Sequence, residues 1–168
     1  LMECASIASS KVIITIAPNI RDEIVHRYHI GEEKTITIMS GVESESQHVS
    51  MRKEEAKERL KMDPLKLLVF TRHIARKRVD LFLKAIFILA QKGLLGTVEL
   101  RIGGDGPIRP QLENLARKLR IDQRVRFLGW LPGDDLALHY RASDIFVMCS
   151  DYEAAPATVL EAMIHGAA

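Results

Sequence analysis

Residues 65–107 read LKLLVFTRHIARKRVDLFLKAIFILAQKGLLGTVELRIGGDGP, and their pattern is the clearest indication of the fold class. Two short apolar runs, LKLLVF at 65–70 and TVELRI at 97–102, have the length and continuous hydrophobicity of buried strands. Between them, apolar side chains repeat at helical spacing from Val79 to Leu89. A strand, a helix and a second strand in this order predict a parallel pair joined by a crossover helix that packs on the sheet.

The same alternation continues towards the carboxyl end. VRFLG at 125–129 and IFVMCS at 145–150 are two further strand candidates. The helical patterns between and after them run from Leu112 to Leu119, from Leu136 to Tyr140, and onward from Pro156. Continuous apolar strands that alternate with helices predict an α/β domain with a doubly wound, Rossmann-like parallel sheet.

The first fifty residues carry a strand–helix–strand pattern of their own. They hold two strand candidates, KVIITIA at 11–17 and KTITIM at 34–39, with an amphipathic helix between them. These strands belong either to the main sheet or to the edge of a neighbouring domain. We therefore assign residues 1–50 to an interdomain or first-strand segment and residues 51–168 to the Rossmann-like domain. The chain stops directly after a helix, Gly166 being third from the end, so we expect this domain to be truncated at its carboxyl end.

Composition excludes several classes of protein. Of the 168 residues, 47% are hydrophobic and 27% are charged, which excludes disordered and fibrous chains. A net charge of +2 gives no bulk attraction for nucleic acid, so we expect no such partner. The longest apolar run, 79–90, contains Asp80 and Lys84 and is shorter than the roughly 20 residues of a membrane-spanning helix. Cys149 lies in an apolar run far from Cys4, which favours a reduced thiol and a cytoplasmic setting.

Cations and glycines follow the first two strands of the predicted sheet. In open α/β sheets, ligands bind beyond the carboxyl ends of the strands. Arg72 and Lys77 follow the first strand and can converge on a diphosphate, whereas Arg76 and Arg78 fit a solvated face better. The run GGDGP at 103–107 either offers backbone amides to an anion or is only the glycine-rich turn that a strand-to-helix connection needs. The sequence alone leaves both interpretations of the glycines open.

Two glutamates follow the last predicted strand. Glu153 falls in the loop and Glu161 on the first turns of the next helix, with seven residues between them. A carboxylate pair fits a glycoside hydrolase, but a glutamate near a helix start is also a common partner of the helix dipole. His26 and His29 share a helix face without a third ligand nearby, so we expect no metal site.

The residues around this glutamate pair resemble a family signature. The signature consists of Ser150, Glu153, Pro156, the run 160–163 and Gly166. Their order and spacing resemble those of retaining, nucleotide-sugar-dependent glycosyltransferases with the GT-B fold. This large group is the group 1 family, which is similar to glycosyltransferase family 4. Further blocks of that family lie upstream in the expected order, namely a variant interdomain block at 38–43, Arg72 with 77–80, 104–107 and 125–129. The resemblance covers nearly the whole chain and implies the carboxyl-terminal, donor-binding half of a GT-B fold.

The resemblance also implies roles for single residues. Arg72 and Lys77 would hold the donor diphosphate and stabilise the charge that grows on it, and Glu153 would contact the hydroxyls of the sugar. Glu161 would accept hydrogen bonds from the ribose hydroxyls. The other residues implied in donor binding are Gly104, Gly106, Trp130, Leu131, Ala154 and Ala155. The two alanines stand where the family commonly has a glycine and an aromatic residue.

The implied reaction transfers a hexosyl unit from a nucleotide-diphosphate sugar to a glycan or lipid-linked acceptor, as in polysaccharide biosynthesis. An amino-terminal domain would hold the acceptor, and no metal or other cofactor is implied. We expect the enzyme in the cytoplasm, with peripheral membrane association left open. Two alternatives also stay open, a non-catalytic nucleotide-binding module and a protein similar to nucleotide-sugar epimerases. A nicotinamide-binding Rossmann domain is disfavoured, because no GxGxxG motif follows the strand at 65–70.

Overall fold

The chain forms two compact units, each with its own sheet. The computed structural model describes residues 6–7, 9–42, 50–62 and 65–168. The first unit comprises Leu1–Val42 with Glu153–Ala157, and the second comprises Glu43–Tyr152 with Thr158–Ala168. Cys4 and Glu43 lie outside the described residues.

The first unit contains a two-stranded parallel sheet. Its strands β1 (Ile13–Thr15) and β2 (Thr35–Thr37) pair along their whole length. Between them run helix α2 (Pro18–Tyr28) and the 3₁₀ turn η1 (Glu32–Lys34). Helix α2 begins at a proline, which is suited to the first position of a helix, and ends at His29 in the left-handed conformation. The two amino-terminal strands therefore form a sheet of their own.

The second unit contains the main sheet. Its strands are β3 (Lys66–Phe70), β4 (Glu99–Gly103), β5 (Val125–Gly129) and β6 (Ile145–Phe146). They are all parallel and lie in the order β5-β4-β3-β6. The chain therefore runs outward from β3 to β5 and then returns to the other side of β3. This order confirms the predicted doubly wound sheet.

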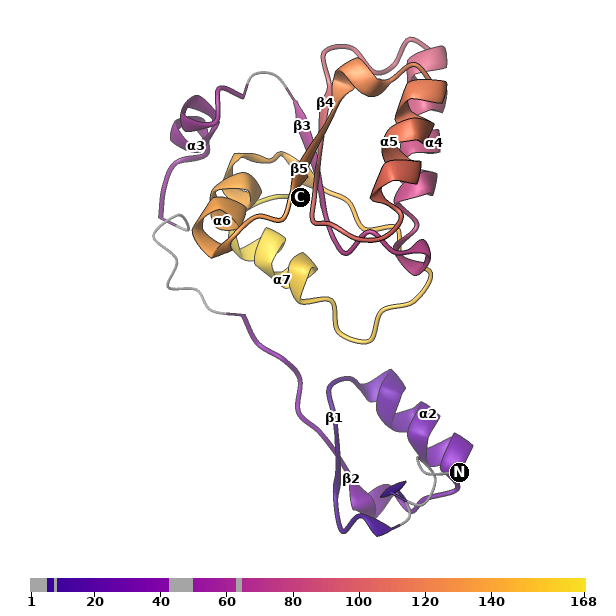
Figure 1. The fold of residues 1–168 in the computed structure, drawn as a ribbon. Coiled ribbons are helices and arrows are strands. Elements are labelled where there is room, and N and C mark those ends of the chain that lie inside the picture. Colours follow the sequence, from indigo (N-terminus) through magenta and orange to yellow (C-terminus); the bar gives the residue numbers. More distant parts are fainter. Residues whose placement is uncertain (1–5, 8, 43–49, 63–64) are drawn as a thin grey trace. The chain divides into compact units, whose positions relative to one another are not determined.

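Helices cover both faces of this sheet (Figure 1). They are α3 (Lys53–Arg59), α4 (Val79–Gln91), α5 (Arg109–Lys118), α6 (Gly133–Ala142) and α7 (Ala157–Ile164), with the 3₁₀ turns η2 (Ala75–Lys77) and η3 (Asp122–Arg124). Figure 1 shows α4 and α5 together on one face, and α6 and α7 on the other. Helices α3 and α6 also pack against each other.

The residues of β3 show how the two faces are filled. All five are buried, as expected for a central strand covered on both sides. Leu67 and Val69 belong to the larger core cluster, which they share with α4 and α5. Leu68 points to the opposite face and packs with Tyr140 of α6 and Ala162 of α7. The alternation of side chains along one strand thus joins the two helical layers.

Strand β6 is shorter than predicted. The apolar run 145–150 predicted a six-residue strand, but the strand ends at Phe146. The Val147 amide still donates to Leu68 O at 2.8 Å, and the chain then leaves the sheet, since the Asp151 amide donates to Arg76 O at 3.0 Å. On the other side of β6, the Phe146 amide donates to the carbonyl of Ala168 at 2.9 Å.

A buried charge cluster lies at the beginning of β3 and β4. Lys66 is 1% exposed and its Nζ lies 2.5 Å from Glu99 Oε2. The other oxygen of Glu99 lies 3.0 Å from Arg101 Nε and 3.1 Å from Arg126 Nε. One carboxylate thus compensates the charge of a lysine that has almost no access to water.

In the described part of the chain, no helix is long and apolar enough to cross a membrane.

Candidate functional site

The loops that follow β3 and β4 are held together by backbone hydrogen bonds. The amide of Thr71 donates to Gly103 O at 3.3 Å, and the amide of His73 donates to Asp105 O at 2.8 Å. The amide of Gly104 in turn donates to Gly129 O, at the end of β5, at 2.7 Å. Three strand ends are thus joined at the carboxyl edge of the sheet, where the sequence predicted a ligand.

Two glycines make this close approach possible. Gly104 has φ +95°, and a Cβ at this position would lie 2.0 Å from the carbonyl oxygen of Thr71. A Cβ at Gly106 would lie 2.5 Å from the carbonyl oxygen of His73. Any larger residue would therefore push the two loops apart. These glycines have a packing role, and through it they hold the backbone on both sides of Arg72.

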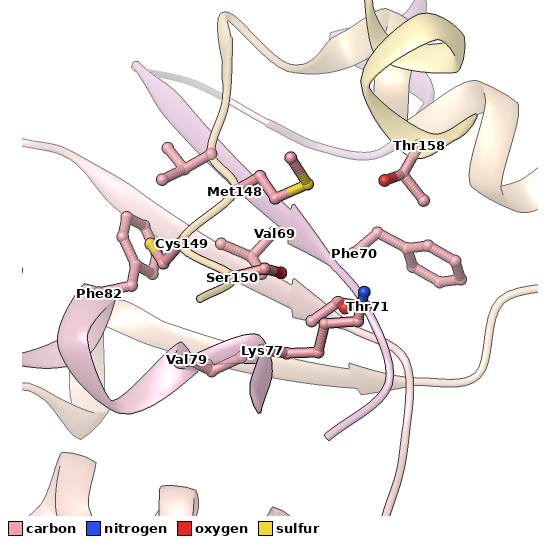
Figure 2. Close-up of a pocket in the computed structure, with 11 residues that line it drawn as sticks. Val69, Phe70, Thr71, Lys77, Val79, Phe82, Met148, Cys149, Ser150 and Thr158 are labelled. Carbon is pink, nitrogen blue, oxygen red and sulfur yellow. The ribbon is translucent and has the colours of Figure 1, made fainter. Parts of the chain in front are cut away.

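The two predicted diphosphate ligands lie in this loop with different exposure. Arg72 is exposed, and its side chain makes no hydrogen bond or ion pair with the residues that the structure describes. Lys77 is half-buried at the end of η2 and lines a small pocket together with Thr71, Ser150 and Thr158. Figure 2 shows the Lys77 side chain extending towards Thr71. This arrangement gathers an ammonium group and three hydroxyl groups at one edge of the sheet.

The pocket beside Lys77 is too small to enclose a diphosphate. Its volume is about 10 Å³, which is about the space of one water molecule. Its inner wall is apolar and includes Val69, Val79 and Phe82. A phosphate group would therefore lie at the mouth of the pocket, against the ammonium and hydroxyl groups, and not inside it.

Arg78, the neighbouring cation, is engaged in ion pairs. Its Nη1 lies 2.8 Å from Asp151 Oδ1, and its Nε lies 3.3 Å from Asp80 Oδ1. The hydrogen bond to Asp151 is the main reason why the pKa of Arg78 is raised. Together with the backbone bond from Asp151 to Arg76, this pair fastens the segment after β6 to the loop after β3. Arg78 was predicted to lie on a solvated face, but its ion pairs give it a structural role. Arg76 is exposed, as predicted.

Trp130 and Leu131, two of the residues implied in donor binding, directly follow β5. Trp130 is 70% exposed, and its ring centroid lies 5.8 Å from that of Phe70 at the end of β3. Leu131 Cδ1 lies 3.4 Å from the position that a Cβ on Gly103 would occupy. An aromatic face is therefore available to solvent beside the glycine loop.

Glu161 has a buried partner that sequence reasoning missed. The hydroxyl of Tyr140 donates to Glu161 Oε2 at 3.0 Å across the α6–α7 layer. Tyr140 is 1% exposed, and burial, followed by the nearby Glu161 charge, raises its pKa. It therefore stays protonated and acts as a donor. In the sequence, Tyr140 was visible only as one apolar position of a short helix.

A second residue that sequence reasoning missed is His73. It follows Arg72 directly, is fully buried, and has no hydrogen-bond partner for either ring nitrogen among the described residues. Its ring packs edge-on against Phe127 with a centroid separation of 6.2 Å. Burial lowers the pKa of His73, so the ring is neutral. The basic residues around His73 in the sequence do not indicate that its side chain points into the core.

The remaining predicted residues belong to the other unit. Glu153, Ala154 and Ala155 are half-buried, and the segment Glu153–Ala157 groups with the amino-terminal residues. Glu153 is engaged in an interaction of its own. Within the described residues, no three His, Cys, Asp or Glu side chains are grouped so that they could hold a metal ion. The second unit thus brings together Lys77, the glycine loop, Trp130 and Leu131, with the Arg72 backbone held between them.

Known proteins are similar to this chain in sequence over most of its length. An uncharacterized glycosyltransferase of Methanocaldococcus jannaschii, MJ1607, is 26% identical over 170 residues, which cover 98% of this chain and 43% of that protein. The sulfoquinovosyl transferase SQD2 of Arabidopsis thaliana is 36% identical over 127 residues, which cover 75% of this chain and 23% of that protein. The chain thus spans less than half the length of these relatives.

Solved structures share the fold. WaaG, a glycosyltransferase involved in lipopolysaccharide biosynthesis, matches with a TM-score of 0.79 at 21% identity, over 92% of this chain and 42% of that one. Alr3699/HepE of Anabaena, solved in complex with UDP and glucose, matches with a TM-score of 0.72 at 19% identity, over 94% of this chain and 43% of that one. Residues 50–168 match the family model described as Glycosyl transferases group 1. The chain therefore belongs to the group 1 family of glycosyltransferases, and the resemblance predicted from its sequence is confirmed.

Proposed function

We propose that this chain binds the donor of a retaining hexosyltransferase, a nucleotide-diphosphate sugar. The observation that carries the proposal is the group of Lys77, Thr71 and the glycine loop at the carboxyl edge of the sheet, with Arg72 exposed beside them. Anions favour such an edge because cationic side chains lie there. The complex of Alr3699/HepE with UDP and glucose supports a uridine nucleotide as the first candidate to test.

The two cations supply the electrostatic part of the proposed reaction. Breaking the glycosidic bond leaves negative charge on the departing diphosphate. Arg72 offers a planar fork of donors that suits phosphate oxygens, and Lys77 offers a compact point charge. Because both groups are placed before the charge develops, they stabilise the transition state more than the ground state. Retention then follows from attack on the same face of the sugar, assisted by the leaving phosphate and without a metal ion or other cofactor.

The other residues hold the donor in place. Glu161 accepts hydrogen bonds from the ribose, Trp130 and Leu131 flank the base, and Glu153 contacts the hydroxyls of the sugar. Gly104 and Gly106 hold the loop that carries Arg72 beside the donor, and the backbone at Ala154 and Ala155 borders the donor. The acceptor, a glycan or a lipid-linked glycan of polysaccharide biosynthesis, is bound by parts of the gene product beyond this chain. We place the enzyme in the cytoplasm.

Titration calorimetry tests the donor site directly. UDP, GDP and ADP, and their sugar conjugates, are titrated into the full gene product and into an Arg72→Ala/Lys77→Ala variant. We expect one nucleotide to bind and its affinity to fall at least about 100-fold in the double variant, because two charge-assisted contacts are lost. Arg76→Ala is the matched control, since it removes an exposed cation from the same loop. An equal loss in the control would mean that only net charge matters and would contradict the proposed site.

Product analysis tests the stereochemistry. The full gene product is incubated with the donor that calorimetry identifies, and the anomeric configuration of the transferred sugar is read by NMR. We expect the configuration of the donor to be kept. An inverted product would refute the retaining mechanism while leaving the donor site intact.

A second candidate is a non-catalytic nucleotide-binding module or a protein similar to nucleotide-sugar epimerases. Ala154, which stands where the family commonly has a glycine, favours the non-catalytic module. The Glu161→Ala variant separates the candidates. If this chain binds the donor, Glu161→Ala abolishes most of the sugar transfer by the full gene product, whereas a non-catalytic module leaves that transfer unchanged.

A further inference from the structure

Tyr140 is the largest fully buried side chain among the described residues, and it lies next to a residue of the proposed donor site. It lies in the last turn of α6, and its hydroxyl reaches α7 to donate to Glu161 Oε2 at 3.0 Å. Glu161 is half-buried, and its other oxygen, Oε1, accepts no hydrogen bond from the described residues. One oxygen of the carboxylate is thus fixed, and the other remains available.

Aromatic packing fixes the ring that carries this hydroxyl. The rings of Phe146 and Phe70 meet Tyr140 edge-on, with centroid separations of 5.6 and 6.5 Å. The ring of His165 stacks on Tyr140 with a centroid separation of 5.8 Å and an interplanar angle of 29°. With three ring neighbours and almost no solvent contact, the hydroxyl has little freedom to turn away from Glu161.

The same group of residues also holds the backbone of Glu161. His165 Nδ1 lies 2.7 Å from the carbonyl oxygen of Glu161. A carbonyl can only accept, so Nδ1 carries the proton and donates it. Tyr140 holds the carboxylate and His165 holds the carbonyl of one residue, and the two rings are stacked on each other. This arrangement limits both the rotation of the Glu161 side chain and the movement of its helix turn.

We propose that Tyr140 is a positioning residue for nucleotide binding: it occupies Glu161 Oε2 and thereby directs Oε1 to a hydroxyl of the donor ribose. The inference rests on the proposed function, because it assigns the ligand of Glu161. It adds a residue that never touches the donor. Tyr140 acts by restricting the carboxylate before the nucleotide arrives, so that less conformational entropy is lost when the ribose binds.

A merely structural tyrosine would have a different signature. If Tyr140 only fills the core, removing its hydroxyl weakens every ligand equally or none at all. If it orients Glu161, the loss is confined to ligands that carry the ribose hydroxyl. The distinguishing quantity is therefore the ratio of affinities for a nucleotide and its deoxy form.

The experiment measures this ratio in the full gene product. UDP, GDP and ADP, each with its 2′-deoxy and 3′-deoxy counterpart, are titrated into the wild type and into Tyr140→Phe, which keeps the ring and loses only the hydroxyl. We expect Tyr140→Phe to bind the ribonucleotide roughly tenfold more weakly, which corresponds to one lost hydrogen bond. One of the deoxy forms should bind both proteins equally. Phe146→Leu is the matched control, because it disturbs the same ring packing without reaching Glu161 and should leave the ratio unchanged.

A double-mutant cycle with Glu161→Ala gives an independent measure. Once the carboxylate is gone, adding Tyr140→Phe should cause no further loss of ribonucleotide affinity. Additive losses, or a Tyr140→Phe variant whose affinities for ribonucleotide and deoxynucleotide fall by the same factor, would overturn the inference while leaving the donor site standing. Failure of the wild type to bind any of the three nucleotides would instead refute the proposed function, and with it this role of Tyr140.

Discussion

Replacing Gly104 by alanine should separate the β3 and β4 loops, and the size of the effect follows from the distances between them. The alanine Cβ would lie 2.0 Å from the Thr71 carbonyl oxygen, whereas ordinary contact begins at 3.4 Å. The backbone must therefore move by more than about 1 Å, enough to break the bonds from Thr71 to Gly103 and from His73 to Asp105. Two such bonds contribute about 1–3 kcal/mol, and the φ of +95° adds about 1–2 kcal/mol of strain. The expected loss of unfolding free energy is about 2–5 kcal/mol.

Two other glycines provide controls for this prediction. Gly93 has φ +68°, but no atom lies within 4 Å of the position that a Cβ would occupy there, so Gly93→Ala measures the strain alone, about 1–2 kcal/mol. Gly133 has open space and begins α6, so Gly133→Ala should leave stability almost unchanged. Urea unfolding of the three variants, followed by circular dichroism, gives the comparison. If Gly104→Ala cost no more than Gly93→Ala, the close approach of the two loops would be refuted.

Three further predictions concern stability and reactivity. Burial lowers the pKa of His139 to about 4, so the folded state binds fewer protons than the unfolded state between pH 6.5 and about 4. Stability should therefore be full above pH 6.5 and fall by about 3 kcal/mol as the pH drops to 4. His139→Leu should flatten this dependence in urea unfolding, and an unchanged slope would contradict it. Glu99→Leu should cost about 3–5 kcal/mol, because it leaves the buried Lys66 unpaired, whereas Arg126→Ala, at 67% side-chain exposure, should cost less than about 1 kcal/mol. Equal melting temperatures for these two variants would disprove the buried pair. Burial raises the pKa of the Cys149 thiol, so iodoacetamide should modify it more slowly at pH 8 than it modifies glutathione, and faster modification would show that the thiol is accessible.

The main sheet could be predicted from the sequence because its strands are central and continuously apolar. The segment 125–129 was predicted with the bounds that β5 has in the structure, and the segment 65–70 differs from β3 by one residue. Strand β6 was overestimated because the apolar run continues to Cys149 after pairing has ended. Beyond Val147 the chain leaves the sheet, and the Asp151 amide bonds to Arg76 O, a contact across the fold that no local pattern records.

Candidate site residues could be selected from the sequence where the choice depends on position along a strand. Arg72, Lys77 and the glycine loop could be selected because each follows a strand whose end faces the same edge of the sheet. The interactions of Tyr140 could not, since its partner Glu161 is 21 residues away on another helix. The sequence pattern of an amphipathic helix does not show whether the hydroxyl of a tyrosine on its apolar face bonds to a carboxylate. Contacts between elements, and not the elements themselves, were missing from the sequence argument.

The glycine loop shows why a packing role and a binding role need not compete. Sequence reasoning left open whether the glycines serve the turn or the ligand. In the structure, Gly104 and Gly106 touch the carbonyls of Thr71 and His73, so their direct contact is with protein. That contact holds the segment that carries Arg72, a cation that has no side-chain partner among the described residues and so depends on its backbone for its placement. If Arg72 binds phosphate, the glycines contribute to binding through this segment, and Gly104→Ala should weaken nucleotide binding even under conditions where the variant remains fully folded.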